Sequence, residues 1–203
     1  TGSHWVKTGI GRSNSEPFSG YDSASVFTPD DIMAGRFPEA GPILLYDDDN
    51  FYMASVLAEA LVARSLEVHL VTPDDVIAGW TSNTLEYRPI QKRLRKLGVN
   101  LHTGKILQRF DGHSAELACV WSVQSQQLAV HAIVSVTMRL PNDGLYQSLV
   151  ALESQWLEAG IQSVQCIGDA LAPGLIAHAV YAGHRFAREF EAEIGENGDN
   201  AEV

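Results

Sequence analysis

Three consecutive carboxylates, Asp47, Asp48 and Asp49, stand where a dinucleotide-binding protein would carry a glycine-rich phosphate turn. An apolar run, GPILLY, ends just before them, and a helix-like run, VLAEALVAR, follows shortly after. A phosphate turn needs glycines because the backbone must approach the pyrophosphate closely. The stretch YDDDNFYMAS has none, and each carboxylate would repel a phosphate charge by about 1 kcal/mol at ~4 Å in water. Asp47, Asp48, Asp49, Asn50 and Phe51 therefore predict a degenerate dinucleotide turn.

Two roles are open to these aspartates. Carboxylates near the start of a helix meet the positive end of its dipole, so we expect them to cap the next helix and lie at the surface. A cation held by all three carboxylates is the alternative. The seven histidines show neither HxH nor HxxxH spacing, so the sequence predicts no histidine metal site.

The elements around the turn form a βαβ unit. Residues 43–46 and 66–73 have the apolar pattern of buried strands, and residues 53–64 have that of a helix packed on a sheet. Such a unit predicts parallel strands joined by a right-handed crossover. A further helix, beginning or kinked near Pro89, and a short strand at 99–104 extend the pattern.

The pattern changes after residue 104. Apolar and polar residues alternate in three runs, KILQRF, AELACVW and QLAVHAIVSVTM. This pattern predicts an antiparallel excursion of two or three strands, after which the chain returns to the sheet as a buried strand. Helices at 148–160 and 174–193 follow, with a strand at 164–168 between them. The predicted fold class is α/β, a Rossmann-like three-layer parallel sheet with an antiparallel β-flap.

Composition limits the class of protein. Hydrophobic residues make up 45% of the 203 residues, charged residues 19%, and the formal net charge is -11. This charge argues against nucleic acid and anionic membranes as partners. No apolar run approaches the ~20 residues that a transmembrane helix requires, so the expected location is cytoplasmic. Cys119 and Cys166 lack a CxxC partner, which indicates buried, unpaired cysteines.

Basic residues gather on one predicted helix. The run KRLRK and Arg88 hold five of the fourteen lysines and arginines. A solvated helix face is one interpretation, and a docking patch for an acidic partner or another domain is the other. Trp80, Trp121 and Trp156 are expected to pack on the core or a sheet face, with stacking on a ligand or partner as the alternative.

Three stretches resemble one known family. YDDDNFYMASVLAEALVARSLEVHLVTP, WTSNTLEYRPIQKRLRKLGVNLHTG and CIGDALAPGLIAHAVYAGHRFARE resemble the C-terminal nucleotide-domain region of the trimethylamine dehydrogenase and histamine dehydrogenase family. This family shares its architecture with 2,4-dienoyl-CoA reductase and other NADH:flavin oxidoreductases. The resemblance spans nearly the whole chain.

The resemblance also bears on the N-terminus, where the chain lacks an initiator Met and is expected to be a piece of a longer protein. GSH at 2–4 is the kind of scar that a cleaved purification tag leaves. In the family, however, a strand ending Ala-Thr-Gly leads to a Gly-Arg-Ser turn and a Phe-Thr-Pro-Asp-Asp segment. The same order is found here in Thr1-Gly2, Gly11-Arg12-Ser13 and residues 27–31. We therefore interpret GSH at 2–4 as native sequence.

The resemblance implies four parts. Residues 1–39 and 140–193 would be fragments of an FAD/ADP-binding-type domain, 40–139 an NAD(P)-binding-domain-like Rossmann unit, and 194–203 a disordered tail. In the family, an N-terminal barrel outside this chain holds FMN beside a 4Fe-4S cluster. ADP or FAD would be bound by the complete protein, and no cofactor is certain for this fragment.

Cofactor contacts are implied for Thr1, Gly2, Gly168 and Asp169. CIGD resembles the strand-end Gly-Asp motif of FAD-type domains, in which the carboxylate accepts a hydrogen bond from a ribityl or ribose hydroxyl. An acceptor at the carboxyl end of a strand suits this role. A plain helix cap is the alternative for Asp169.

The function implied by the resemblance belongs to the complete protein. It is a flavin- and iron–sulfur-dependent oxidoreductase acting on small amines, in which this non-catalytic fragment supplies nucleotide binding, structural support and a docking site for the electron acceptor. The implied partners are the N-terminal barrel and an electron-transferring flavoprotein. An NAD(P)H-dependent 2,4-dienoyl-CoA reductase-like flavoenzyme and a non-catalytic Rossmann-like scaffold with decayed nucleotide sites are the alternatives.

Overall fold

The computed structural model describes residues 2–198, with side chains described through Phe190. Residues 5–138 form one compact unit, and the remaining described residues form another. The division falls near residues 5 and 139, so residues 5–39 belong with the central unit, whereas the sequence placed a boundary at residue 40. The FAD-type character of the outer segments stays a prediction.

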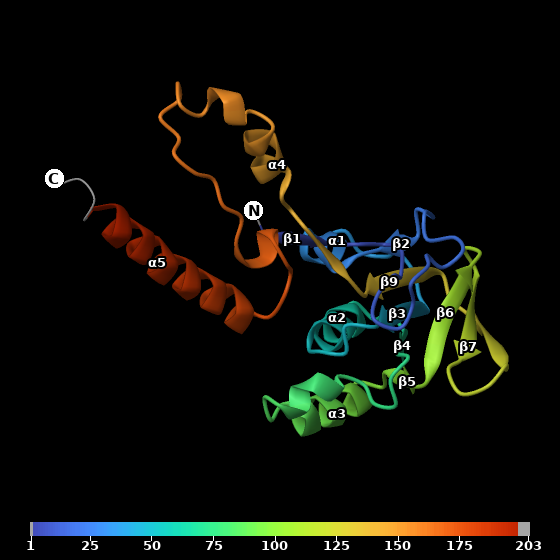
Figure 1. The fold of residues 1–203 in the computed structure, drawn as a ribbon. Coiled ribbons are helices and arrows are strands. Elements are labelled where there is room, and N and C mark those ends of the chain that lie inside the picture. The colour runs from blue at the N-terminus through green and yellow to red at the C-terminus, as the bar shows by residue number, and fades with distance from the viewer. Residues whose placement is uncertain (1, 199–203) are drawn as a thin grey trace. The chain divides into compact units, whose positions relative to one another are not determined.

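A five-stranded parallel sheet forms the centre of the larger unit (Figure 1). Its strands at residues 43–47 and 132–136 are buried along their whole length because both faces of the sheet are covered. This confirms the predicted parallel arrangement. The strands, in their order across the sheet, are β2 (Val26–Phe27), β9 (Ala132–Val136), β3 (Ile43–Asp47), β4 (Val68–Val71) and β5 (Asn100–His102).

Helices cover one face of this sheet (Figure 1). They are α1 (Pro29–Met33), α2 (Met53–Val62) and α3 (Tyr87–Lys96), and the short 3₁₀ helix η1 (Gly79–Ser82) packs beside α3. Leu57 and Leu61 of α2 and Leu94 of α3 are buried in the shared core. Pro89 falls in the first turn of α3, where the backbone N–H has no partner within the helix, so the helix starts without a break.

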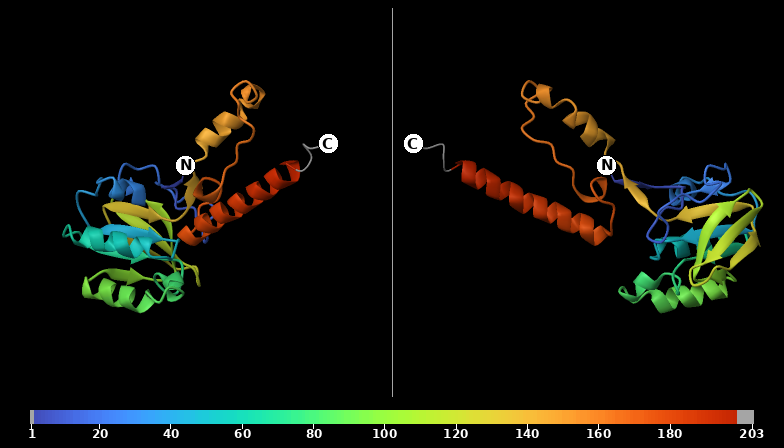
Figure 2. Two further views of the ribbon diagram at one scale, coloured as in Figure 1. Left: turned by 90° about the vertical axis from the view of Figure 1, so that its left-hand side faces the viewer. Right: turned by 45° about the vertical axis from the view of Figure 1, so that its right-hand side comes forward.

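An antiparallel flap covers the opposite face, as Figure 2 shows from two further directions. It consists of β6 (Lys105–Phe110), β7 (Ser114–Cys119) and β8 (Ser125–Ala129). Leu107 and Leu117 of the flap pack with Leu44, Tyr46 and Val71 of the sheet in a second buried cluster. The three-layer architecture with an antiparallel flap is thereby confirmed.

The smaller unit holds β10 (Arg139–Pro141), which pairs with β1 (Ser3–Trp5), a strand whose last residue belongs to the larger unit. It also holds α4 (Gly144–Val150), the 3₁₀ turns η2 (Glu153–Gln155) and η3 (Gly168–Ala170), and α5 (Ile176–Gly198). The predicted helix at 148–160 is wrong, because α4 begins earlier and ends at Val150. The predicted strand at 164–168 is wrong as well, since no described strand lies beside it to complete a hydrogen-bonded ladder.

Three smaller expectations also differ from the structure. Helix α5 continues through Gly198, although disorder was predicted from residue 194, and residues 199–203 lie outside the described part. Cys119 and Cys166 are only partly buried. Trp80 and Trp121 are exposed, so neither packs in the core.

Among the described helices, none combines the length and apolar character that crossing a bilayer requires.

Candidate functional site

A crevice site is expected at the carboxyl end of β3. The chain leaves β3 toward β4 on one side, while β9 lies on the other side, so the strand order reverses here. Open α/β sheets bind their ligands at such a point. The backbone amides of Asp48 and Asp49 both donate to the Val136 carbonyl at the end of β9, at 2.9 and 3.2 Å. The acidic turn therefore lies directly on this edge.

Asp47 is completely buried at the end of β3. Its Oδ1 accepts a 2.9 Å hydrogen bond from the Asn50 amide, and its Oδ2 has no hydrogen-bond partner among the residues that the structure describes. Burial raises the pKa of the Asp47 carboxyl to about 8, opposed by the Asn50 amide and supported by the charges of Asp49 and Asp48. The Asp47 side chain is therefore mostly protonated at neutral pH.

Asp48 is also completely buried. Its carboxylate accepts two hydrogen bonds from Ser13, one from the backbone amide and one from Oγ, both at 2.8 Å. The Nη2 of Arg12 lies 3.6 Å from Asp48 Oδ1. A Cβ atom on Gly11 would lie 2.2 Å from Asp48 Oδ2, so only glycine permits this approach. The Gly-Arg-Ser segment thus packs directly on the Asp48 side chain.

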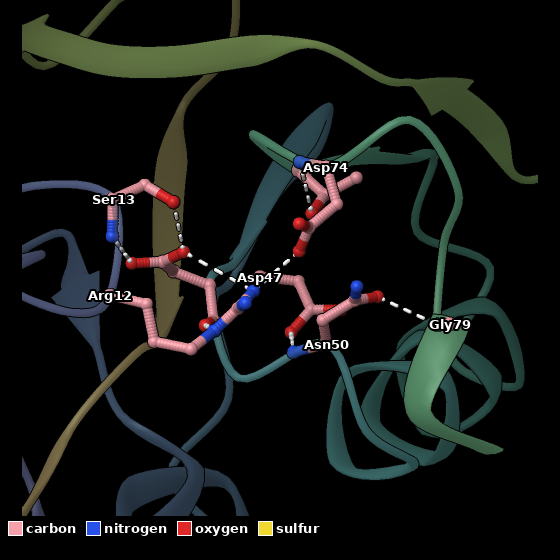
Figure 3. A network of polar contacts seen from close by, with 8 residues as sticks. Arg12, Ser13, Asp47, Asn50, Asp74 and Gly79 are labelled. Atoms are coloured by element: carbon pink, nitrogen blue, oxygen red, sulfur yellow. Dashed lines mark hydrogen bonds and ion pairs between the residues drawn. The ribbon is translucent and has the colours of Figure 1, made fainter. Parts of the chain in front are cut away.

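Arg12 joins the ends of two strands. Its Nε donates a 2.8 Å hydrogen bond to the Asp48 carbonyl, and its Nη2 forms an ion pair with Asp74, which follows β4. Figure 3 shows Arg12, Ser13, Asp47 and Asp74 within one network of polar contacts. The guanidinium therefore covers the strand ends at the place where a ligand phosphate would be expected.

Asn50 completes the turn with a left-handed backbone, φ 52°. Its Oδ1 accepts a 2.8 Å hydrogen bond from the Gly79 amide, and its carbonyl accepts one from the Trp80 amide at 3.2 Å. Phe51 stacks edge-on against Tyr52, with ring centroids 5.0 Å apart. The hydrogen bonds of Asn50 tie the acidic turn to η1, and Figure 3 shows the one to Gly79.

The capping interpretation of the aspartates is wrong. The N-cap of α2 is Tyr52, which has no side-chain capping bond, and Asp47 and Asp48 are buried instead of lying at the surface. The cation alternative gains no support, because the described residues contain no group of three or more His, Cys, Asp or Glu that could hold a metal ion. Asp48 serves as the anchor for Arg12 and Ser13.

The structure thus fills this crevice with groups of the protein itself. The buried Asp48 carboxylate is paired with the charge of Arg12 and accepts hydrogen bonds from Ser13, and the turn contains no glycine. Arg12, Ser13 and Asp74 were not predicted as members of this site. Two of them, Arg12 and Ser13, belong to the Gly-Arg-Ser segment noted in the sequence. Their contact with Asp48 could not be predicted from the sequence, because Ser13 and Asp48 are 35 residues apart.

A second candidate site lies in the smaller unit around Asp169. A cavity of about 320 Å³ is lined by Gly2, Asp169 and neighbouring residues, among them the apolar side chains of Leu145, Leu149 and Ile167. Its size is at the lower end of the range for ligand pockets, roughly 300–1,000 Å³. The structure therefore brings two of the predicted contact residues to one cavity, next to Gly168, while Thr1 lies outside the described part.

The Asp169 carboxylate is held by its own unit. It accepts a 3.1 Å hydrogen bond from the Gly174 amide, and Ser3 Oγ and Arg139 Nη1 lie 3.5 and 3.7 Å from its Oδ2. The last two contacts are long, so lone pairs stay free for a hydroxyl group of a ligand. The neighbouring backbone at Gly168 has φ +62°, a left-handed conformation that favours glycine. This arrangement fits a hydroxyl-bearing ligand such as a ribose.

Comparison with known proteins identifies the family of the larger unit. Residues 27–135, just over half of the 203-residue chain, match the family model described as the OYE-like second alpha/beta domain. The chain belongs to this family. The matched range begins in β2 and ends in β9, so the OYE-like domain covers the parallel sheet, its helices and the flap.

Three similar proteins are named as amine dehydrogenases or an amine oxidase. Dimethylamine dehydrogenase of Hyphomicrobium sp. (strain x) is 28% identical over 94% of this chain and 28% of that protein. Histamine dehydrogenase from Rhizobium sp. 4-9 is 40% identical over 93% of this chain and 29% of that chain, with a TM-score of 0.89. The 6-hydroxypseudooxynicotine amine oxidase of Pseudomonas geniculata N1 is 35% identical over 91% and 27%, with a TM-score of 0.85.

These matches identify the chain as a C-terminal region of the trimethylamine dehydrogenase and histamine dehydrogenase family, confirming the predicted resemblance. It is a domain of an oxidoreductase family. The chain spans less than a third of the length of the relatives that it matches. Activity, substrates and partners of a complete protein are therefore matters of proposal.

Proposed function

We propose that this chain is the nucleotide-domain region of a flavin- and iron–sulfur-dependent amine dehydrogenase. In the complete protein, an N-terminal barrel with FMN and a 4Fe-4S cluster would oxidise a small amine, and an electron-transferring flavoprotein would accept the electrons. The present region would support the barrel, contact ADP or FAD through Asp169, and bind neither NADH nor NADPH. The 40% identity to histamine dehydrogenase supports the enzyme class, and the filled crevice over Asp48 supports the loss of NADH and NADPH binding.

Loss of NAD(P)H binding follows from charge and space at the crevice. A pyrophosphate placed at the end of β3 would meet the buried Asp48 carboxylate, and it would have to displace Arg12 from both Asp48 and Asp74. Displacement would leave Asp48 buried without its guanidinium partner, an outcome that costs several kcal/mol for a buried charge. This argues against the 2,4-dienoyl-CoA reductase alternative, which requires a functional NAD(P)H site.

The need for a larger domain is supported by exposed apolar side chains in the smaller unit. Leu157 and Ile176 are 93% and 80% exposed, and Leu145, Val180 and Tyr181 are each more than half exposed. So many exposed large apolar side chains in one small unit indicate surface that another part of a protein covers. In the proposal, preceding segments of the parent protein cover these side chains and complete the nucleotide site beside Asp169.

Calorimetric titration of the full-length parent protein tests the cofactor assignment. We expect NADH and NADPH to bind with dissociation constants weaker than about 1 mM, and ADP or FAD to bind at least ~100-fold more tightly. Tight binding of NADH or NADPH would overturn the argument from the filled crevice and favour the reductase.

Asp169 has its own test within the same protein. An Asp169→Asn substitution is expected to weaken ADP or FAD binding about tenfold, because a charged acceptor becomes a neutral one. Asp143→Asn is the matched control, since Asp143 lines the same cavity but is engaged by Gln147 at 2.9 Å. Equal effects of the two substitutions would remove Asp169 from the nucleotide site.

A scaffold without any nucleotide is the second candidate, and the filled crevice favours it equally. The two candidates differ at the cavity beside Asp169. If the intact parent binds neither ADP nor FAD while it still oxidises an amine, the region is a structural support only.

A further inference from the structure

Helix α3 carries basic side chains that have no partner among the residues that the structure describes. Among its five basic residues, Arg93 pairs with Glu59 at 3.0 Å, and Arg95 folds back onto the carbonyl and side chain of Gln91. The other three are exposed, and they form no ion pair or hydrogen bond with any residue that the structure describes. We call these three the basic face: Arg88, Lys92 and Lys96.

The stability of α3 does not explain the basic face. Lys96 lies in the last turn, where a cation meets the negative end of the helix dipole, but Arg88 lies in the first turn, where a cation is unfavourable. The three residues are spaced i, i+4, i+8, so neighbouring like charges repel along the helix. The first turn holds no acidic residue to offset this repulsion. The charges therefore indicate a role outside the fold of this helix.

Two large apolar side chains that precede α3 in the chain are exposed. Trp80 of η1, which packs beside α3, is 54% exposed, and Leu85, three residues before Arg88, is 87% exposed. Tryptophan and arginine are the residue types enriched at the energetic centres of protein interfaces. Helix α3 and the segment just before it thus carry exposed apolar side chains together with the one arginine and two lysines of the basic face, a set suited to docking an oppositely charged protein surface.

We infer that the basic face and Trp80 dock an acidic surface of a partner protein. The spacing along α3 calls for a row of three carboxylates about 6 Å apart, as one face of an acidic helix provides, with an apolar residue beside them for Trp80 and Leu85. Charge complementarity selects this occupant. Nucleic acids and anionic membranes are less suited, because the chain as a whole carries a net charge of -11 and repels extended polyanions.

A labelled helical peptide tests this inference on the full-length parent protein. The peptide carries Glu at i, i+4 and i+8 with one adjoining Leu, and binding is followed by fluorescence anisotropy at low and at high salt. We expect saturable binding that weakens as salt rises, and an affinity at least about tenfold lower for Lys92→Glu. Arg109→Glu, an equal charge reversal at an exposed position of the flap, is expected to change the affinity less than about twofold.

Three outcomes would overturn the inference. The first is absence of saturable binding, and the second is equal affinity for a peptide of the same composition with scrambled Glu positions. The third is tighter binding of heparin fragments or phosphatidylserine vesicles that is lost in Lys92→Glu, because it would assign the basic face to a polyanion. The NADH and ADP titrations do not depend on this face, so failure here leaves the proposed function in place.

Discussion

Replacing Asp48 with alanine is expected to lower the free energy of unfolding by about 3 kcal/mol. The substitution removes the buried acceptor of two 2.8 Å hydrogen bonds from Ser13 and the counter-ion of Arg12. The Ser13 amide then loses its partner, and the segment around Gly11 loses the side chain on which it packs. Urea unfolding of the variant and the unsubstituted protein, followed by far-UV circular dichroism, measures the difference.

Asp75→Ala is the matched control for this experiment. Asp75 is exposed and directly follows Asp74, the other ion-pair partner of Arg12. It removes the same charge without a buried contact, so we expect a change within about 0.5 kcal/mol. If Asp48→Ala were as mild as Asp75→Ala, the anchoring role of Asp48 would be wrong. If both substitutions destabilised the protein strongly, net charge would be the cause.

The stability of the protein is expected to fall as pH rises from about 4 to about 9, and Asp47 is the cause. Its folded-state pKa of about 8 lies above the ordinary value of 3.8, so its contribution is fully present below the lower value and is lost as pH rises through the higher one. A difference of one pKa unit between the folded and unfolded states corresponds to about 1.4 kcal/mol in the free energy of unfolding. Relaxation around the charge reduces the total contribution of Asp47 to the order of 3 kcal/mol.

An Asp47→Asn variant isolates this effect. The amide oxygen keeps the hydrogen bond from the Asn50 amide but carries no charge at any pH. We expect the variant to be less sensitive to pH than the unsubstituted protein and more stable than it at about pH 9. Urea unfolding at a series of pH values measures this. Parallel curves for the two proteins would show that Asp47 does not titrate in this range.

Much of the central fold follows from local sequence pattern. The apolar runs before and after the acidic turn have the lengths and spacing of a βαβ unit, and β3, α2 and β4 lie where the pattern placed them. The flap was predictable because alternation of apolar and polar residues is a property of short segments. In the smaller unit the same reasoning failed at residues 148–168, where few buried contacts decide between helix, turn and extended chain.

The absence of glycine from the acidic turn was evident in the sequence, and it was enough to predict a dinucleotide turn that had lost its glycines. The burial of Asp47 and Asp48, and the contacts of Arg12 with Asp48 and Asp74, were decided only by the tertiary structure. The reason is physical. Residue type and spacing determine local backbone preference, whereas the charge state and partner of a carboxylate depend on groups that folding brings from 35 or 62 residues away.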